Sequence, residues 1–201
     1  MTRIVTELAV SADGYVAGPD DNRESPLGTG GGRLFEWYSD GEIPSRFYPS
    51  SRLSAASAAV FDEVCERTGA VISGRRTYDI VDGWNGDGPL PGAPLFVLTH
   101  EPPDVVPDGS STYTFITTGI EDAVERARAA AGDKDVSLMG SAPVQEALRA
   151  GLLDEIVLHQ VPVLLGGGVR LLDGTAADLR CTRVVDAPGV THLFYDVVRD
   201  S

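Results

Sequence analysis

Two adjacent arginines follow a glycine at the point where an apolar run changes to a helical pattern. Residues 70–72 (Ala-Val-Ile) favour a buried strand, and residues 77–81 are typical of a short helix. Arg75 and Arg76 carry guanidinium groups that bind phosphate oxygens in pairs, and Gly74 lets a ligand approach the backbone. Free N–H groups at a helix start also favour an anion. The junction therefore predicts either a phosphate site or an ordinary turn with solvated arginines.

A second junction of this kind follows residues 136–139. Gly140 is followed by Ser141 and Ala142, and a proline then pre-sets the first turn of a helix. Open α/β sheets bind ligands at the carboxyl ends of their strands, where both junctions lie. Two such junctions can hold the phosphates of one dinucleotide. Neither junction has the Walker pattern or a Gly-x-Gly-x-x-Gly motif, and the glycine run at residues 28–32 favours a flexible loop.

Length and charge narrow the class of protein. The chain has 201 residues, is 42% hydrophobic and carries a formal net charge of −14. One domain covering residues 1–201 is expected at this length. The acidic balance argues against nucleic acid or an anionic membrane as a partner. Lys134 is the only lysine among 16 cationic residues, so the arginines beside Gly74 stand out on an acidic chain.

Nothing in the sequence indicates a membrane segment or a metal site. A spanning helix needs about 20 apolar residues, and no run approaches that length. Residues 4–10 are interrupted by Glu7 and lack the core of a signal peptide. Cys65 and Cys181 are far apart, which favours reduced buried thiols, and the three histidines have no metal-ligand spacing. We expect a soluble, cytoplasmic protein without a metal.

Apolar periodicity predicts strands that alternate with helices and then strands alone. This order predicts an α/β fold with a mostly parallel sheet and an antiparallel pair of strands at the C-terminus. Pro162 suggests an edge position or a bulge for its strand. The expected strands are residues 3–10, 70–72, 95–99, 113–116, 136–139, 154–165, 179–186 and 191–198, and the expected helices are residues 54–66, 77–81, 121–131 and 144–150.

Six segments in a fixed order resemble a known superfamily. They are residues 11–17 (Ser-Ala-Asp-Gly-Tyr-Val-Ala), 74–78 (Gly-Arg-Arg-Thr-Tyr), 97–99 (Val-Leu-Thr), 139–141 (Met-Gly-Ser), 153–156 (Leu-Asp-Glu-Ile) and 162–168 (Pro-Val-Leu-Leu-Gly-Gly-Gly). The set resembles the dihydrofolate reductase-like superfamily. It is most similar to the branch of the C-terminal reductase domain of the bifunctional deaminase-reductase of bacterial riboflavin biosynthesis. The resemblance runs from residue 3 to residue 198 and implies a three-layer fold, bound NADPH and a homodimer.

The resemblance also implies which residues would bind NADPH. The pyrophosphate and the 2′-phosphate would lie on the first junction, the adenosine side after the next strand, and the nicotinamide between the first loop and the second junction. These residues are Gly74, Arg75, Arg76 and Thr77; Thr99 and His100; and Val16, Ala17, Met139, Gly140, Ser141 and Ala142. The family usually has two adjacent glycines where this chain has Gly140 and Ser141. The serine could restrict the backbone approach or donate a hydrogen bond to a phosphate.

The reaction implied is hydride transfer to a carbonyl or imine carbon of a small heterocyclic or ribityl-type substrate. Reduction by 5-amino-6-(5-phosphoribosylamino)uracil reductase is the nearest example. Two alternatives stay open: a pteridine or dihydrofolate reductase, and a non-catalytic nucleotide-binding regulatory domain of the same fold.

The sequence offers three candidate proton donors. Folate reductases place a carboxylate on the helix after the first loop, but residues 17–49 do not match that pattern. Glu36 and Asp40 lie in this segment, with surface exposure as their alternative role. Asp13 is the third candidate, and a turn before Gly14 is its alternative role.

Several aromatic residues could wall a substrate pocket. Trp37, Tyr38, Phe47 and Tyr48 flank the variable segment, and core packing explains them equally well. Arg170 could meet a substrate phosphate or lie in solvent.

Overall fold

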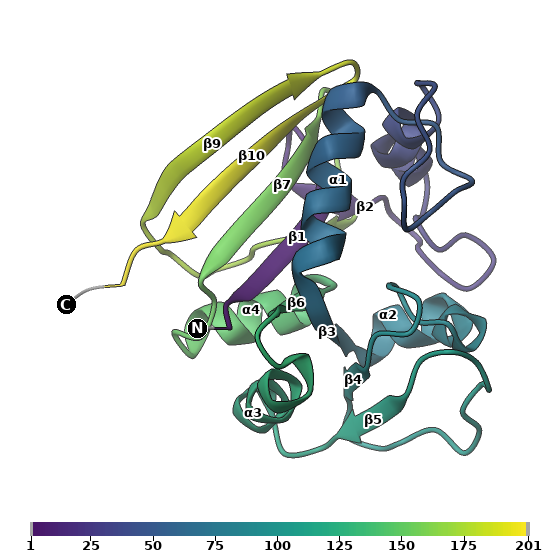
Figure 1. Cartoon of the computed structure of the whole chain (residues 1–201), viewed down its shortest axis with the longest axis vertical. Helices are drawn as coiled ribbons and strands as arrows, with labels where there is room; N and C mark the ends of the chain where they lie inside the picture. Colours follow the sequence, from purple (N-terminus) through teal and green to yellow (C-terminus); the bar gives the residue numbers. More distant parts are fainter. Residues whose placement is uncertain (1, 200–201) are drawn as a thin grey trace.

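One mixed sheet of eight strands organises the computed structural model, which describes residues 2–199 (Figure 1). The strand order is β5-β4-β3-β6-β1-β7-β10-β9. Neighbouring strands from β5 to β7 are parallel, and β10 is antiparallel to β7 and to β9. The strands are β1 (Ile4–Ser11), β3 (Thr68–Gly74), β4 (Leu95–Leu98), β5 (Tyr113–Ile116), β6 (Asp135–Met139), β7 (Glu155–Val161), β9 (Leu179–Ala187) and β10 (Val190–Val197). This confirms the predicted fold class.

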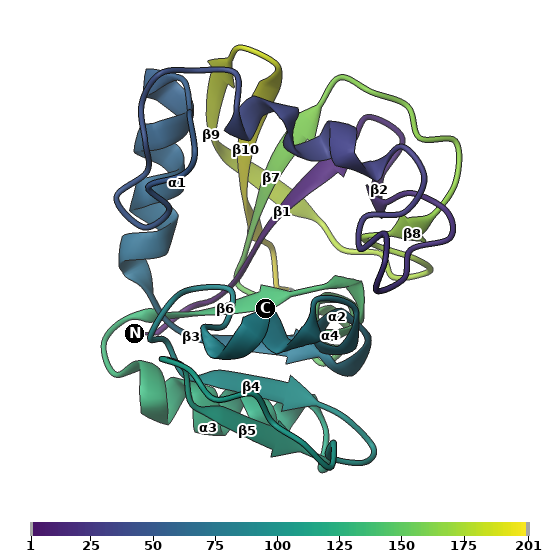
Figure 2. The ribbon, with the colours of Figure 1, turned by 90° about the vertical axis from the view of Figure 1, so that its right-hand side faces the viewer.

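Helices cover both faces of the sheet, which gives three layers (Figures 1 and 2). One core cluster joins the sheet to α3 and α4 through residues such as Ile72, Leu138 and Ala123. Other clusters lie under α1 and α2, around Val64 and Val71. The helices are α1 (Ala55–Arg67), α2 (Arg75–Ile80), α3 (Ile120–Ala131) and α4 (Ser141–Arg149), with 3₁₀ segments η1 (Gly31–Tyr38) and η2 (Asp82–Gly86). No helix among the described residues is long and apolar enough to cross a bilayer.

Helix α1 forms where the sequence predicts it. The Ser54 side chain caps the helix by accepting a hydrogen bond from the backbone N–H of Ser57. Ala58, Phe61, Val64 and Cys65 recur at spacings of three and four residues and are buried. An apolar stripe with a serine cap is therefore sufficient to specify this helix.

Some element boundaries differ from the prediction. Strand β7 ends at Val161, because Pro162 has no N–H to donate, and it lies between β1 and β10 instead of at an edge. Helices α2 and α4 begin at Arg75 and Ser141, earlier than expected. Both arginines of the first junction therefore lie in the first turn of α2. The sequence analysis did not predict the two-stranded ribbon of β2 (Tyr15–Ala17) and β8 (Val169–Arg170).

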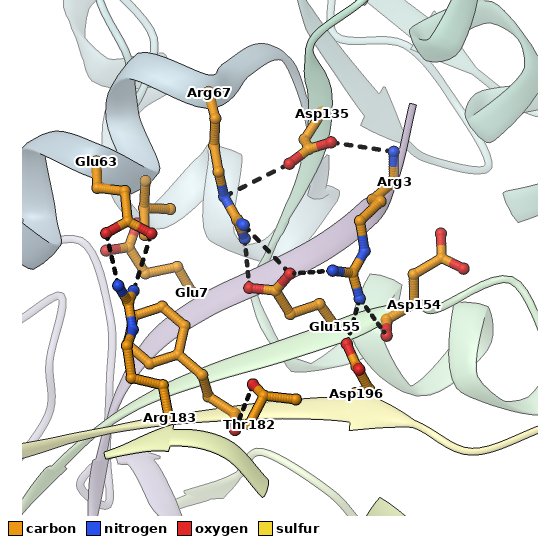
Figure 3. Close-up of polar contacts among 12 residues, drawn as sticks. Arg3, Glu7, Glu63, Arg67, Asp135, Asp154, Glu155, Thr182, Arg183 and Asp196 are labelled. Atoms are coloured by element: carbon orange, nitrogen blue, oxygen red, sulfur yellow. Dashed lines mark hydrogen bonds and ion pairs between the residues drawn. The ribbon is translucent and has the colours of Figure 1, made fainter. Parts of the chain in front are cut away.

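A buried ionic cluster ties the amino ends of the central strands together (Figure 3). Glu155, at the start of β7, is 4% exposed. Its Oε2 lies 2.9 Å from Arg3 Nη1 on the chain before β1 and accepts from Arg67 Nη1 of α1 at 3.2 Å. Asp135 of β6 accepts from the Arg3 backbone N–H at 3.0 Å and lies 3.4 Å from Arg67 Nε. The cluster, named the Glu155 cluster below, thus joins three strands and one helix.

Replacement of Glu155 by Gln should lower the free energy of unfolding by about 2 kcal/mol, because it leaves two arginines without their shared carboxylate. This is less than a fully buried pair would cost, since Arg3 and Arg67 retain access to water. Glu66→Gln, which breaks a pair between two mostly exposed side chains, should cost about 0.5 kcal/mol or less. Urea unfolding measures both values. Equal losses in the two variants would contradict a structural role for the Glu155 cluster.

Candidate functional site

A cavity of about 660 Å³ opens along the carboxyl edge of the sheet. Its walls come from β1, β3, β6 and β7, from the start of α2 and α4, and from α1, η1 and the first loop. Ligand pockets of about 300–1,000 Å³ are common in enzymes that bind small molecules. The cavity thus has the size and position expected of a ligand site in an open α/β sheet.

The first junction lines this cavity with Gly74, Arg75, Arg76 and Thr77. Arg75 Nε donates to both carboxylate oxygens of Asp79 at 2.8 and 2.9 Å, and its Nη1 donates to Thr99 Oγ1 at 3.2 Å. Helix α2 has only six residues, so its dipole is short. Attraction for an anion here rests mainly on the two guanidinium groups.

Arg76 links the junction to the first loop. Its Nη2 donates to Asp21 Oδ1 at 2.6 Å and to the Asp21 carbonyl at 3.0 Å. The Arg76 side chain is 64% exposed. It is therefore free to turn toward an anion in the cavity if that anion competes with Asp21.

The second junction contributes Met139, Gly140, Ser141 and Ala142 to the same cavity. Gly140 has φ +89°, and a Cβ built on it would lie 2.5 Å from Thr77 Oγ1. A Cβ on Gly74 would likewise lie 3.3 Å from Cδ of Pro143 in the first turn of α4. The two junctions are in direct contact because both glycines lack side chains.

These features fit the phosphate part of a dinucleotide. One side of the cavity presents two guanidinium groups, and the other presents Gly140, which has no side chain, at the N-cap of α4, a helix of nine residues. The first loop closes the end of the cavity near β2, where Val16 and Ala17 line it. A Cβ on Gly168 would lie 2.1 Å from the Ala17 carbonyl oxygen, so the turn at residues 166–168 requires glycine there.

Several residues that the sequence suggested lie outside the cavity lining. They are Asp13, Glu36, Trp37, Asp40, Phe47, Thr99, His100 and Arg170. Glu36, Asp40 and His100 are exposed. Thr99 reaches the site only through Arg75.

Trp37, Phe47 and Arg170 have other partners. Trp37 is 3% exposed, and its indole N–H donates to the Leu34 carbonyl at 2.9 Å. Phe47 packs against the core below α1, with the Arg46 guanidinium 5.7 Å from its ring centre. Arg170 lies over the Tyr15 ring at 4.6 Å. These three residues therefore do not form the cavity wall in this structure, whereas Tyr38 and Tyr48 do line the cavity.

Asp13 has a structural role. Its carboxylate accepts hydrogen bonds from Ser11 Oγ at 2.6 Å, from the Leu165 N–H at 3.1 Å and from the Gly166 N–H at 2.7 Å. The Ser11 bond, followed by these backbone bonds, lowers the Asp13 pKa to about 2. Asp13 is thus an anion at neutral pH and is unsuited to donate a proton.

The sequence analysis missed a carboxylate on the cavity floor. Glu7 on β1 lines the cavity, and its side chain is 15% exposed. Its Oε1 lies 2.8 Å from His159 Nε2 on β7. Behind it, His159 Nδ1 lies 2.8 Å from His192 Nδ1 on β10, and His192 Nε2 lies 3.1 Å from Ser57 Oγ on α1. A glutamate inside an apolar strand was the available signal, because such a charge needs a partner.

Burial changes the acidity of the groups around Glu7. It raises the pKa of Tyr38, of Tyr48 and of the Cys65 thiol, and the charge of Glu7 raises each of them further. Burial, with His159 and Arg183 nearby, lowers the pKa of His192 to about 3. All four groups are consequently neutral at pH 7. Cys65 is buried and Cys181 is exposed, so the expectation of two buried thiols is wrong for Cys181.

Comparison with known proteins gives a family match over most of the chain. The model of the RibD C-terminal domain family matches residues 2–192. No curated protein is similar enough in sequence to count as a match.

Solved structures share the fold. A protein from Shewanella sp. PV-4 named for riboflavin biosynthesis has a TM-score of 0.70 and 24% identity, over 99% of this chain and 100% of that one. RibD from Acinetobacter baumannii has a TM-score of 0.64 and 15% identity, over 99% of this chain but only 59% of that one. Dihydrofolate reductase from Enterococcus faecalis, solved with NADP(H), has a TM-score of 0.55 and 14% identity, over 97% and 96%.

Replacement of Gly140 by Ala should destabilise the protein by about 1–3 kcal/mol, because the φ and ψ of this residue are essentially restricted to glycine. The new methyl group would also press on Thr77 and separate the junctions. Gly151→Ala is the matched control, since Gly151 also has positive φ but has open space around it. Urea unfolding and the NMR shifts of Thr77 measure the effects. No shift at Thr77 would contradict the contact.

Replacement of Asp13 by Asn should reduce stability at pH 7, and the difference from the natural protein should disappear with acid. The folded pKa of Asp13 is lowered from 3.8 to about 2, so its stabilisation is complete above pH 4 and is lost as the pH falls toward 2. Urea midpoints at pH 7, 4 and 2.5 follow this change. A difference independent of pH would show that the charge of Asp13 is irrelevant.

Proposed function

The chain belongs to the RibD C-terminal domain family, and from that premise we propose that it is an NADPH-dependent reductase. It transfers a hydride to a carbonyl or imine carbon of a small heterocyclic or ribityl-type substrate, as 5-amino-6-(5-phosphoribosylamino)uracil reductase does. One observation supports this proposal most directly. The contact between Thr77 and Gly140 joins two junctions, one of them with two arginines, over a single cavity.

The residues of the two junctions would hold the cofactor. Arg75 and Arg76 would bind the 2′-phosphate and the pyrophosphate. Because NADH lacks the 2′-phosphate, the contact with that group would favour NADPH over NADH. Residues 140–142 would approach the pyrophosphate with their backbone, and Val16 and Ala17 would lie beside the nicotinamide. NADPH, when bound, supplies the hydride, and the protein supplies positioning and a dry site.

Charge competition is built into this binding site. Arg75 pairs with Asp79 and Arg76 pairs with Asp21, so an incoming phosphate must share or replace a carboxylate. The chain carries a net charge of −14, which repels an anion at long range. Cofactor affinity should therefore depend on the local arginines far more than on the overall field.

The other end of the cavity suits a flat ring. Phe35, Tyr38, Tyr48 and Phe61 line it, and the lining carries little charge apart from Glu7. Aromatic walls bind planar heterocycles and exclude water from the reacting carbon. A carboxylate among aromatic rings also keeps a pteridine or dihydrofolate substrate as the second candidate. Loss of turnover with retained nucleotide binding would instead support a regulatory domain.

We include a cytoplasmic homodimer in the proposal. Strand β9 is at the edge of the sheet, and Leu179 and Val184 on it are exposed. An open strand with exposed apolar side chains favours association. Sedimentation of the purified protein tests this, and a monomer at micromolar concentration would contradict it.

Fluorescence titration with NADPH and NADH tests the cofactor assignment. Arg75→Ala with Arg76→Ala should raise the NADPH Kd about 10- to 100-fold, as expected for about 1.5–3 kcal/mol of charge-assisted bonds, and should change the NADH Kd less than about threefold. Arg126→Ala is the control, because Arg126 also forms an i,i+4 ion pair, with Asp122 on α3, and lies outside the cavity lining. Absence of binding to either nucleotide would refute the reductase proposal. Equal affinities would refute only the role of the arginines.

Oxidation of NADPH with 5-amino-6-(5-phosphoribosylamino)uracil or with dihydrofolate tests the substrate. Turnover of the uracil supports the proposed reaction, and turnover of dihydrofolate alone favours the second candidate. NADPH binding without turnover of either compound favours the regulatory alternative.

A further inference from the structure

A chain of hydrogen bonds connects the start of α1 to the cavity floor. It runs from Ser54 through Ser57, His192 and His159 to Glu7, and so crosses from α1 to β10, β7 and β1. Ser57, His192 and His159 are each at most 2% exposed. Such buried polar groups are stable only when each donor meets an acceptor. The direction of every bond in the chain is therefore constrained by its neighbours.

The helix cap provides the first bonds of this chain. The backbone N–H of Ser57 can only donate, and it donates to Ser54 Oγ at 3.1 Å. The Ser54 hydroxyl hydrogen is then directed to Ser57 Oγ at 3.0 Å. Ser57 in turn has its own hydrogen available for His192 Nε2.

The two histidines continue the donor-to-acceptor direction of the hydrogen bonds toward the cavity. His192 is neutral, because burial lowers its pKa to about 3. Since Nε2 accepts from Ser57, the hydrogen of His192 is on Nδ1 and is donated to His159 Nδ1. Because His159 Nδ1 accepts this hydrogen, His159 donates to Glu7 Oε1 from Nε2. Among the described residues Oε2 of Glu7 has no hydrogen-bond donor, so a proton carried by Glu7 resides on Oε2.

No other acid is suitably placed at this end of the cavity. The titratable groups around Glu7 are His159 on β7, Tyr38 on η1, Cys65 on α1 and Tyr48 before α1. The two phenols and the thiol hold their protons more tightly than usual because burial raises each pKa. Asp21 also lines the cavity but is paired with Arg76.

We propose that Glu7 is the proton donor of the reduction and that His159, His192 and Ser57 are positioning residues that keep its proton on Oε2, the oxygen that His159 does not contact. This inference rests on the proposed function. A hydride adds to the carbon of the C=O or C=N bond, and the π electron pair moves to the heteroatom. The heteroatom takes the proton from Glu7 Oε2, and the resulting carboxylate recovers a proton from water between turnovers. One hydride and one proton are thus consumed for each bond reduced.

NMR of ¹⁵N-histidine protein tests the positioning chain without any substrate. At pH 7, His159 should be the Nε2–H tautomer and His192 the Nδ1–H tautomer. Ser57→Ala should remove this preference at His192, because its Nε2 loses the donor. Glu125→Gln, a change of an exposed residue on α3, should leave both tautomers unchanged. The opposite tautomers, or a protonated His192, would overturn the assignment of the Glu7 proton.

Kinetics with the variant Glu7→Gln test the proton donor. NADPH affinity should stay within about twofold of the natural protein, while single-turnover hydride transfer to 5-amino-6-(5-phosphoribosylamino)uracil should fall about 10²- to 10⁴-fold. In the natural protein the rate should fall as the pH rises, because each turnover consumes a proton, and the variant should lose this dependence. Glu125→Gln should match the natural protein in both respects.

The outcomes separate the two proposals. An unchanged rate in Glu7→Gln, or a change in KM alone, would overturn the role of Glu7 as proton donor. Failure of the natural protein to bind NADPH would refute the proposed function, and failure to reduce the uracil would refute this substrate. In that case the NMR experiment still decides whether the positioning chain exists. Ser57→Ala should lower kcat several-fold with little change in KM when kcat is expressed per folded protein, so that a loss of stability does not account for the change.

Discussion

The position of the Glu155 carboxylate is the constraint on which the central sheet depends. A carboxylate that is 4% exposed is costly unless it is paired, and here Arg3 and Arg67 pair with it. These arginines also join β1, β6 and α1, so the cluster fixes strands and helix relative to one another (Figure 3). Side chains alternate along a strand, and a slip of one residue would turn Glu7 away from His159. Pairing at the amino ends therefore secures the geometry at the opposite edge.

The arrangement of residues at the carboxyl edge of the sheet follows from the register of its parallel strands. Because β3 and β6 are parallel neighbours with Ser73 beside Met139, the two chain segments that leave them are adjacent. Thr77 and Gly140 meet for this reason, and the cavity forms over their contact. Cavity-lining residues separated by more than sixty positions thus share a wall without any local sequence signal that connects them.

The sequence is informative where structure is local. A few neighbouring residues are enough to encode some features, and the structure contains each of them. They are the serine cap and apolar stripe of α1, the two glycine junctions and the C-terminal hairpin. Glu7, His159 and His192 meet only because β1, β7 and β10 pair, which no local pattern specifies. Trp37 illustrates the same limit. From the sequence, an aromatic residue in a loop-like segment could line a pocket or pack in the core. In the structure, the η1 helix places the Trp37 ring against His159 and His192, in the core.

The contact between Thr77 and Gly140 also divides the cofactor region into fixed and variable parts for protein engineering. A side chain on Gly140 displaces the other junction, so this backbone cannot be redesigned one residue at a time. Arg76 makes its bonds outward to the first loop and carries no part of that contact. Under the proposed cofactor assignment, a library limited to residue 76 and its partner Asp21 can search for altered nucleotide selectivity while the Thr77–Gly140 contact stays intact.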